Sequence, residues 1–142
     1  ISLALKAAEM GVLVFGTLHT NSAAKTIDRL IDVFPADEQP QARLSLADSL
    51  AAIVAQLLVP RAGGAGRVAV HEILLKTPAL PNLIRESSIS MLTNLMQAGR
   101  SEGMQLLDDA LLDLVTRKIV TPRDAYMKAS DKSRFEPLLE GE

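Results

Sequence analysis

The residues of this sequence that are best suited to chemistry lie together in one short segment. His19 directly follows the apolar run 12–18, and the polar side chains of Thr17, Thr20 and Asn21-Ser22 surround it. A neutral imidazole donates one hydrogen bond and accepts another, and the neighbouring hydroxyls add further donors and acceptors. Such a group can respond to a terminal phosphate or to an attacking water. A local turn that caps the next helix explains the same residues equally well, so the pattern alone leaves both interpretations open.

Metal and phosphate sites of the common kinds are poorly supported in this sequence. The two histidines, His19 and His71, stand far apart, and without a cysteine they make a weak zinc site. The stretch Gly63–Gly66 is followed by Arg67 and a predicted strand, whereas a phosphate-binding loop needs Lys with Ser or Thr and then a helix. We interpret this stretch as a hairpin turn between a helix and a strand.

The other notable polar residues have structural interpretations. His71 lies inside an apolar run, which predicts a partly buried, hydrogen-bonded histidine of the core. The pair Asp108-Asp109 and the terminal Glu140 and Glu142 are predicted to be ordinary solvated charges. No arrangement of serine, histidine and aspartate indicates nucleophilic catalysis.

Hydrophobic patterning predicts an α/β unit followed by helices. A helix that opens the chain is expected to end at Gly11, and the apolar run 12–18 is predicted to be a buried strand. His19 then stands beyond the carboxyl end of this strand, where ligands bind in open α/β sheets. Residues 37–58 are predicted to form one long helix, with an apolar face made of Leu46, Leu50, Ile53, Val54 and Leu57. Residues 67–75 are a second strand candidate, and helices are expected at about 79–86, 88–98, 105–118, 122–129 and 132–140.

The composition excludes several classes of protein. Of the 142 residues, 48% are hydrophobic, 23% are charged and 3% are aromatic, and the formal net charge is -2. That charge gives no electrostatic reason to expect nucleic acid as a partner. The absence of cysteine excludes disulfides and thiolate metal sites, and it favours a cytoplasmic location. No apolar run approaches the roughly 20 residues of a membrane-spanning helix, so no transmembrane segment is expected. The chain opens within a helical pattern and without an initiator methionine, so we expect a piece of a longer protein.

Several segments, in the right order, resemble one family. Residues 13–35, LVFGTLHTNSAAKTIDRLIDVFP, are similar to the His box of the secretion ATPase superfamily, which drives type IV pili and type II secretion. The similarity continues through GRVAVHEI at 66–73, ALPNLIRE at 79–86 and GMQLLD at 103–108. It covers nearly the whole chain.

Within this superfamily, the chain most resembles the pilus-retraction (PilT-like) branch. Assembly and secretion ATPases usually insert a four-cysteine zinc loop where residues 60–66 bridge the gap directly here. Residues 79–86 resemble the AIRNLIRE motif of the retraction branch, from which Leu80 and Pro81 depart. The proline fixes φ and removes one cation.

The resemblance implies a fold and a set of site residues. The fold is α/β, with a partial RecA-like P-loop NTPase core over residues 1–75 and a helical C-terminal subdomain over residues 76–142. His19, with Thr17 and Thr20, would face the γ-phosphate of ATP. ATP and Mg2+ would be bound mainly by residues that this chain lacks.

Two further sets of residues carry roles implied by the resemblance. Arg29 falls at the arginine of the His box, whereas periodicity alone describes it as a solvent-facing helix residue. A conformational or partner-contacting segment would consist of Asn82, Leu83, Ile84, Arg85 and Glu86. By pattern alone these five residues form an ordinary surface helix.

The implied whole protein is a homohexameric motor at the cytoplasmic face of the bacterial inner membrane. ATP hydrolysis would pull on an inner-membrane pilus platform protein and retract the pilus. The phosphate loop and the Walker B glutamate would precede residue 1, so this chain alone is expected to be inactive as an ATPase. Two alternatives remain open: a pilus assembly or type II secretion ATPase without the zinc loop, and a non-catalytic helical adaptor.

Overall fold

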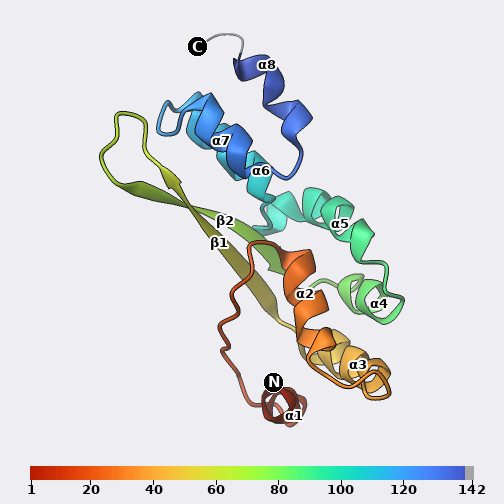
Figure 1. Ribbon diagram of the computed structural model, residues 1–142. Helices are drawn as coiled ribbons and strands as arrows, with labels where there is room; N and C mark the ends of the chain where they lie inside the picture. The colour runs from red at the N-terminus through yellow and green to blue at the C-terminus, as the bar shows by residue number, and fades with distance from the viewer. Residues whose placement is uncertain (140–142) are drawn as a thin grey trace.

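The computed structural model describes residues 1–139 and shows helices arranged along a long β-hairpin (Figure 1). The first part of the chain forms α1 (Ser2–Glu9), α2 (Ala23–Asp32), α3 (Gln39–Ser49), β1 (Ala52–Pro60) and β2 (Arg67–Leu75). The second part forms α4 (Leu80–Arg85), α5 (Leu92–Ala98), α6 (Leu107–Thr116), α7 (Pro122–Lys128) and α8 (Glu136–Leu139). Short 3-10 helices occur at Ile89–Met91, Gly99–Glu102 and Lys132–Arg134. The helices α1 to α4 lie at one end of the hairpin, and α6 to α8 lie at the other.

The predicted long helix over residues 37–58 is wrong, because its second half is strand β1. The helix α3 ends at Ser49, and Ala52–Pro60 pairs antiparallel with β2, with Gln56 opposite His71. Burial alternates along β1, so Ile53 and Ala55 are buried whereas Val54 between them is 63% exposed. This period of two, together with the cross-strand hydrogen bonds, outweighs the helical spacing of the leucines.

The glycine-rich stretch joins two strands rather than a helix and a strand. It forms the loop between β1 and β2, where Gly63, Gly64 and Gly66 have φ values of 87°, 79° and 80°. Such positive φ angles suit glycine because it has no Cβ. The interpretation as a hairpin turn is therefore confirmed, with a different element on its N-terminal side.

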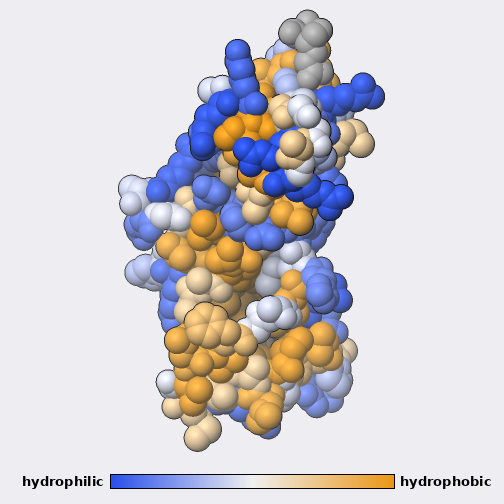
Figure 2. Space-filling model, turned by 90° about the vertical axis from the view of Figure 1, so that its left-hand side faces the viewer, coloured by the Kyte–Doolittle hydropathy of each residue, from blue (hydrophilic) through white to orange (hydrophobic). Residues whose placement is uncertain are grey.

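Residues 12–18, predicted to be a buried strand, form an extended segment that pairs with no strand of the described residues. The one sheet within residues 1–139 contains only β1 and β2. Leu13 and Phe15 are accordingly 74% and 91% exposed. Figure 2 shows the side of the molecule along which this segment runs, and apolar side chains gather in the lower half of that view. The prediction fails because a strand needs hydrogen-bonded neighbours, and its own apolar sequence cannot supply them.

The hairpin contributes to two apolar cores. One core lies at the α1–α4 end and includes Ile27, Ile31, Leu46, Leu74, Leu80, Ile84 and Met96. The other lies between the far half of the hairpin and the last helices, and includes Val59, Val70, Leu111, Val120, Ala125 and Phe135. Because β1 and β2 supply residues to both cores, the hairpin holds the two groups of helices in place.

The helices expected after residue 78 are present with shifted ends. The expected helix 88–98 begins as a 3-10 turn and becomes α5, and the expected 105–118 is shortened to α6. The expected helix 132–140 is divided into the turn Lys132–Arg134 and α8, and its last position lies outside the described residues. The helix that opens the chain is also confirmed, as α1.

Candidate functional site

A pocket of about 630 Å³ brings together three of the residues predicted to form a site. It is lined by Leu18, His19, Thr20, Asn21, Lys25, Arg29, Val54 and Gln56. The first six come from the segment before α2 and from α2 itself. Val54 and Gln56 come from the outward face of β1. The pocket therefore lies where the His19 segment and α2 meet the hairpin.

The start of α2 positions the cationic side chains of this pocket. Ser22 is the N-cap, and its hydroxyl accepts the backbone N–H of Lys25 at 3.2 Å. The helix buries Ile27 and Ile31 and exposes Lys25 and Arg29, which are four residues apart and therefore share one face. Amphipathic spacing thus directs both cations toward the pocket while the opposite face packs on the core.

Hydrogen bonds fix the residue after His19. The Thr26 hydroxyl donates to the Ser22 carbonyl at 2.8 Å, and the Thr20 and Thr26 hydroxyl oxygens lie 2.6 Å apart. Because the only hydroxyl proton of Thr26 is used on Ser22, Thr20 is the donor between the two threonines. Thr20 is thereby tied to the first turn of α2, which limits where the adjacent His19 can stand.

The pocket is suited to an anion. Its lining contains Lys25, Arg29 and the exposed imidazole of His19, together with two side-chain amides and no carboxylate. A magnesium ion prefers carboxylate oxygens, and the lining offers none, so these residues fit phosphate oxygens better than a metal. Lys25 Nζ donates to Asn21 Oδ1 at 3.4 Å, which keeps the ammonium at the rim.

Thr17 lies apart from His19 and Arg29. It lines a neighbouring, mainly apolar cavity of about 520 Å³ between α1, the extended segment 12–18, α3 and β1. Thr20 lines both cavities. The structure therefore groups His19, Thr20 and Arg29 and places Thr17 on the adjoining side of the segment.

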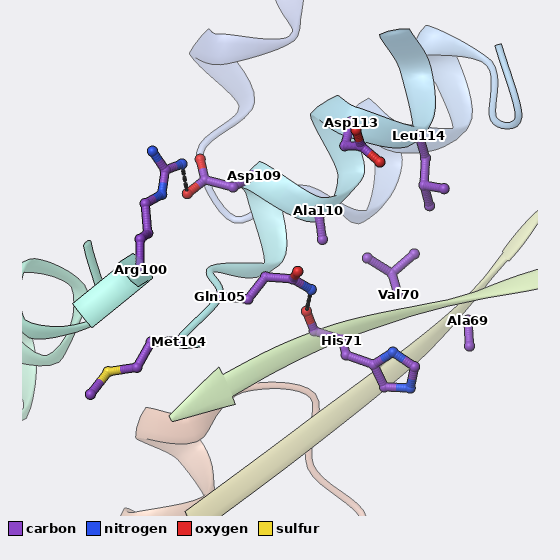
Figure 3. Close-up of a pocket in the computed structure, with 10 residues that line it drawn as sticks. All are labelled: Ala69, Val70, His71, Arg100, Met104, Gln105, Asp109, Ala110, Asp113 and Leu114. Atoms are coloured by element: carbon purple, nitrogen blue, oxygen red, sulfur yellow. Dashed lines mark hydrogen bonds and ion pairs between the residues drawn. The ribbon is translucent and has the colours of Figure 1, made fainter. Parts of the chain in front are cut away.

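A further pocket of about 400 Å³ lies between β2 and α6 (Figure 3). Arg100 and Asp109 face each other at one end in an ion pair, and Gln105 Nε2 donates to the His71 carbonyl at 2.7 Å. The His71 ring contacts Gln56 Oε1 at 2.9 Å and His71 is half-buried, which confirms the predicted hydrogen bond and partial burial. The predicted core position is wrong, because this contact is exposed on the outward face of the hairpin, which also carries Gln56. The polar side chains of this pocket already have partners within the protein, including Arg117 for Asp113, so we interpret the arrangement as structural.

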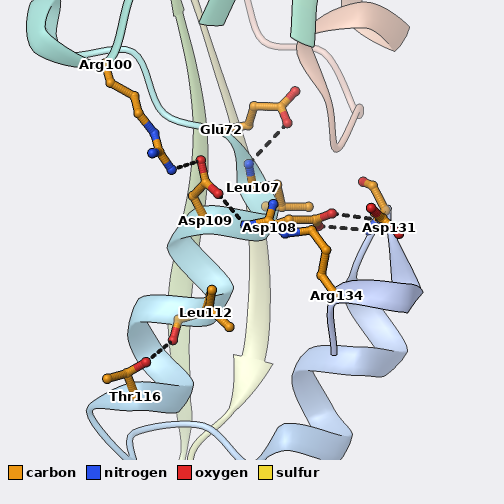
Figure 4. Close-up of polar contacts among 10 residues, drawn as sticks. Glu72, Arg100, Leu107, Asp108, Asp109, Leu112, Thr116, Asp131 and Arg134 are labelled. Atoms are coloured by element: carbon orange, nitrogen blue, oxygen red, sulfur yellow. Dashed lines mark hydrogen bonds and ion pairs between the residues drawn. The ribbon is translucent and has the colours of Figure 1, made fainter. Parts of the chain in front are cut away.

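The prediction that Asp108 and Asp109 are ordinary solvated charges is wrong (Figure 4). Asp108 is 7% exposed and accepts the backbone N–H groups of Ser130 and Asp131, both at 2.8 Å. The helical periodicity predicted an exposed Asp108. A carboxylate can nevertheless be buried when backbone N–H groups donate hydrogen bonds to it, as they do here. The other predicted solvated acids, Glu140 and Glu142, lie outside the described residues.

Asp109 lies between two arginines. Arg134 Nη2 is 2.7 Å from one carboxylate oxygen, and Arg100 pairs with the other. Partial burial acts to raise the pKa of Asp109, but the hydrogen bonds from Arg134 and Arg100 and their positive charges hold it below its ordinary value. The hydrogen bond to Asp109 correspondingly raises the pKa of Arg134.

Comparison with known proteins assigns this chain to a family. A family model described as "Type II/IV secretion system protein" matches residues 1–126. The chain belongs to this family.

Relatives in the secretion system family include pilus proteins. The chain is 50% identical over 135 residues to the "Type IV pilus retractation ATPase PilT" of Pseudomonas aeruginosa, covering 95% of this chain and 39% of that protein. It is 49% identical over 131 residues to the "Twitching motility protein" of Neisseria gonorrhoeae, covering 92% of this chain and 35% of that protein. The chain therefore spans well under half the length of these relatives.

A solved structure in the secretion system family has the same fold. The "Crystal Structure of the Pilus Retraction Motor PilT and Bound ADP" matches with a TM-score of 0.82 and 40% identity, covering 96% of this chain and 38% of that one. The expected fold class, a partial RecA-like core followed by a helical C-terminal part, is confirmed by this match.

The segment that resembled the retraction motif lies on α4, away from the anion pocket. Ile84 is fully buried and Leu83 is half-buried, whereas Asn82, Arg85 and Glu86 are exposed. Arg85 forms an ion pair with Asp48 of α3 and donates to Asn82 Oδ1 at 3.2 Å. None of these residues lines the pocket that holds His19.

Sequence reasoning missed Lys25 and Gln56 as pocket residues. The signal for Lys25 was available, because it precedes Arg29 by four positions on the polar face of a predicted helix. The sequence offered no usable signal for Gln56. Its place in the pocket depends on the hairpin of β1 and β2, whereas the sequence predicted a helix over residues 37–58. The roles predicted for Thr17, His19, Thr20 and Arg29 remain predictions.

Residues 1–139 contain neither a cluster of metal ligands nor a membrane-spanning helix. No group of three or more histidine, cysteine, aspartate or glutamate side chains is placed to hold a metal ion. None of the helices in this range has the length and apolar character needed to cross a membrane.

Proposed function

We propose that this chain contributes the phosphate-sensing part of an ATP-driven motor that retracts type IV pili. The 50% identity over 135 residues to a pilus retraction ATPase carries this proposal. The cationic pocket around His19 supports it, because a phosphate-sensing site requires such a lining. Since the chain covers 39% of that relative, the activity belongs to the whole protein rather than to these residues alone.

Each pocket residue has a distinct part in this proposal. His19 stands beyond the extended segment and would face the γ-phosphate of ATP, with Arg29 and Lys25 adding positive charge. Thr20, held by Thr26, would fix the position of His19, and Thr17 would act from the adjoining cavity. The imidazole can stabilise phosphate charge and change partners when the phosphate leaves. Mg2+ would neutralise the phosphates in the complete site, held by carboxylates that this pocket does not contain.

The proposed assembly is a homohexamer that works at the cytoplasmic face of the inner membrane. Residues 1–75 would belong to the ATPase core and residues 76–142 to a C-terminal subdomain. The exposed side chains of Asn82, Arg85 and Glu86 are available to a partner, whereas Leu83 and Ile84 hold α4 on the core. The proposed partner is the inner-membrane pilus platform protein.

Phosphate recognition is tested directly on this chain. Inorganic tripolyphosphate is added while the ring resonances of His19 and His71 are followed by NMR. We expect a saturable shift of His19 alone, weakened about threefold to tenfold by Lys25→Ala or Arg29→Ala, since each removes one charge from an exposed site. Lys128→Ala, an exposed lysine on α7, is the matched control and should leave binding unchanged. An unresponsive His19, or an equal loss with the control, would contradict the site.

The motor assignment needs the whole protein in a cell. His19→Ala in a full-length protein that carries this chain should abolish ATP hydrolysis and twitching, whereas Lys128→Ala should retain both. The isolated 142-residue chain should show no ATP hydrolysis. Loss of pilus extension instead of retraction would favour an assembly or secretion ATPase, and normal hydrolysis in the His19→Ala protein would favour an adaptor-like role for this segment.

A further inference from the structure

A single buried carboxylate accepts hydrogen bonds from the beginnings of two helices. Glu72 of β2 is 9% exposed. Its Oε1 accepts the backbone N–H of Ala23 at 2.7 Å, and its Oε2 accepts the backbone N–H of Leu107 at 3.3 Å. Figure 4 shows the contact with Leu107, the first residue of α6. Ala23 is the first residue of α2.

The two contacts satisfy donors that neither helix can satisfy itself. The first N–H groups of a helix have no intrahelical acceptor. In α2 the Ser22 side chain takes the N–H of Lys25, which leaves that of Ala23 for Glu72. In α6 the N-cap residue Leu106 has no side-chain acceptor, so Glu72 supplies one. The negative charge also complements the positive ends of both helix dipoles.

Glu72 lies between the His19 segment and the C-terminal helices, so its two hydrogen bonds connect these parts of the chain. Ala23 is separated from His19 only by the residues that form the pocket rim and the cap of α2. On the other side, Asp108 follows Leu107 and binds the backbone of Ser130 and Asp131. Ala23 is therefore connected through Glu72 to Leu107, and through the adjacent Asp108 to Ser130 and Asp131, which follow α7.

The backbone around Glu72 strengthens the connection to α6. Ile73 and Gln105 exchange two backbone hydrogen bonds, of 2.8 and 3.0 Å. The residues just before α6 are therefore fixed to β2 next to the carboxylate. Glu72 does not line the pocket that holds His19, so it cannot act on a ligand there directly.

We propose that Glu72 is a positioning residue that couples the anion pocket to the C-terminal helices by fixing the first turns of α2 and α6 to one another. The pocket's role in phosphate sensing rests on the proposed function, whereas the link between the helices does not. A change in the position of His19 on phosphate binding or loss is passed through Ala23 and Glu72 to Leu107. The C-terminal helices then respond to the state of the pocket.

The experiment compares Glu72→Gln with Leu74→Val in the 142-residue chain. Glutamine keeps the shape of the side chain but offers one acceptor oxygen, so one of the two N–H groups loses its partner. Leu74 lies on the same face of β2 and is fully buried, so Leu74→Val is a control for destabilisation that leaves both hydrogen bonds in place. Amide hydrogen exchange at Ala23 and Leu107 and tripolyphosphate binding at His19 are measured in the wild type and both variants.

We expect Glu72→Gln to accelerate exchange at Ala23 or Leu107 by about tenfold or more relative to Leu74→Val. In the wild type, tripolyphosphate should shift the Leu107 amide resonance as well as His19, and in Glu72→Gln only the His19 response should remain, with weaker affinity. Unchanged exchange at both amides, or an unchanged Leu107 response in Glu72→Gln, would overturn the coupling. If wild-type His19 does not respond at all, the proposed phosphate site fails, and the exchange measurement still decides whether Glu72 links the helices.

Discussion

The Asp108 carboxylate accepts the backbone N–H of Ser130 at 2.8 Å, which joins the first turn of α6 to the chain that follows α7. Its second oxygen accepts the N–H of Asp131 at the same distance. The carboxylate is buried, and Asp109 beside it binds Arg134 of the same C-terminal stretch. The two adjacent acids, which lie in the first turn of α6, thus hold the last part of the described chain against this helix.

Replacement of Asp108 by alanine should destabilise the protein strongly. Two charge-assisted hydrogen bonds are lost, at about 1.5–3 kcal/mol each before water replaces them at the freed N–H groups, so we expect a net loss of about 2–3 kcal/mol. Urea denaturation followed by circular dichroism measures it. Asp113→Ala is the matched control, because its ion pair with Arg117 is exposed and should contribute less than about 0.5 kcal/mol. Equal destabilisation by the two substitutions would contradict the structural role of Asp108.

The sequence could predict the local part of the candidate site. His19, Thr20 and Arg29 lie within one capped helix and the residues before it, so a turn and a 3.6-residue period suffice to bring them together. Gln56 comes from a strand whose identity depends on pairing with β2, and no local pattern contains that information. Asp108 and Glu72 show the same limit, because the backbone groups that they bind are remote in sequence.

The predictions for the apolar runs show the same limit, because only some of the strands were predicted correctly. Residues 67–75 form a strand as predicted, and 52–60 form a strand where a helix was expected, since a short apolar run fits either structure until a partner strand is present. The run 12–18 has the composition of a buried strand but no strand partner among the described residues. Strand formation is a property of a pair of segments, which explains why helices were predicted with fewer errors than strands.

Adjacent substitutions in β1 distinguish the strand from the predicted helix. Ala55 is 3% exposed and Val54 is 63% exposed, whereas the helix interpretation places Val54 on the buried face. Ala55→Asp should cost about 3 kcal/mol or more, because it buries a carboxylate without a partner. Val54→Asp should cost about 1 kcal/mol or less, since only strand propensity and some apolar contact are lost. Urea denaturation of both variants provides the measurement, and the reverse order would restore the helix.

The environment of Asp109 predicts a dependence of stability on pH. Its pKa in the folded protein is lower than in the unfolded chain, so the folded state favours the charged carboxylate. This stabilisation is fully present above the ordinary aspartate pKa of about 3.9 and is lost as the pH falls through the lower folded value. Asp109→Asn should therefore flatten the loss of stability below about pH 4. Urea denaturation across this range tests it, with Asp113→Asn as the control. A pH profile of Asp109→Asn that matches the wild type would contradict the ion-pair assignment.

Substitutions at the neighbouring residues Ile84 and Arg85 can test the role of α4 in folding separately from its proposed role in partner binding. Ile84 is fully buried, so Ile84→Ala should cost about 2–5 kcal/mol through lost contacts and a cavity. Arg85 pairs with Asp48, but its side chain is 39% exposed and that of Asp48 is 63% exposed, so Arg85→Ala should cost less than about 1 kcal/mol.

This difference makes Arg85 the informative position for the proposed partner contact. In a full-length protein that carries this chain, Arg85→Ala should reduce pilus retraction while the unfolding midpoint changes little. Asp48→Ala breaks the same ion pair without removing the arginine, so it should retain retraction if Arg85 acts on a partner. Equal loss of retraction in Arg85→Ala and Asp48→Ala would mean that the pair only holds α4 against α3, because both substitutions remove that contact and only one removes the exposed guanidinium.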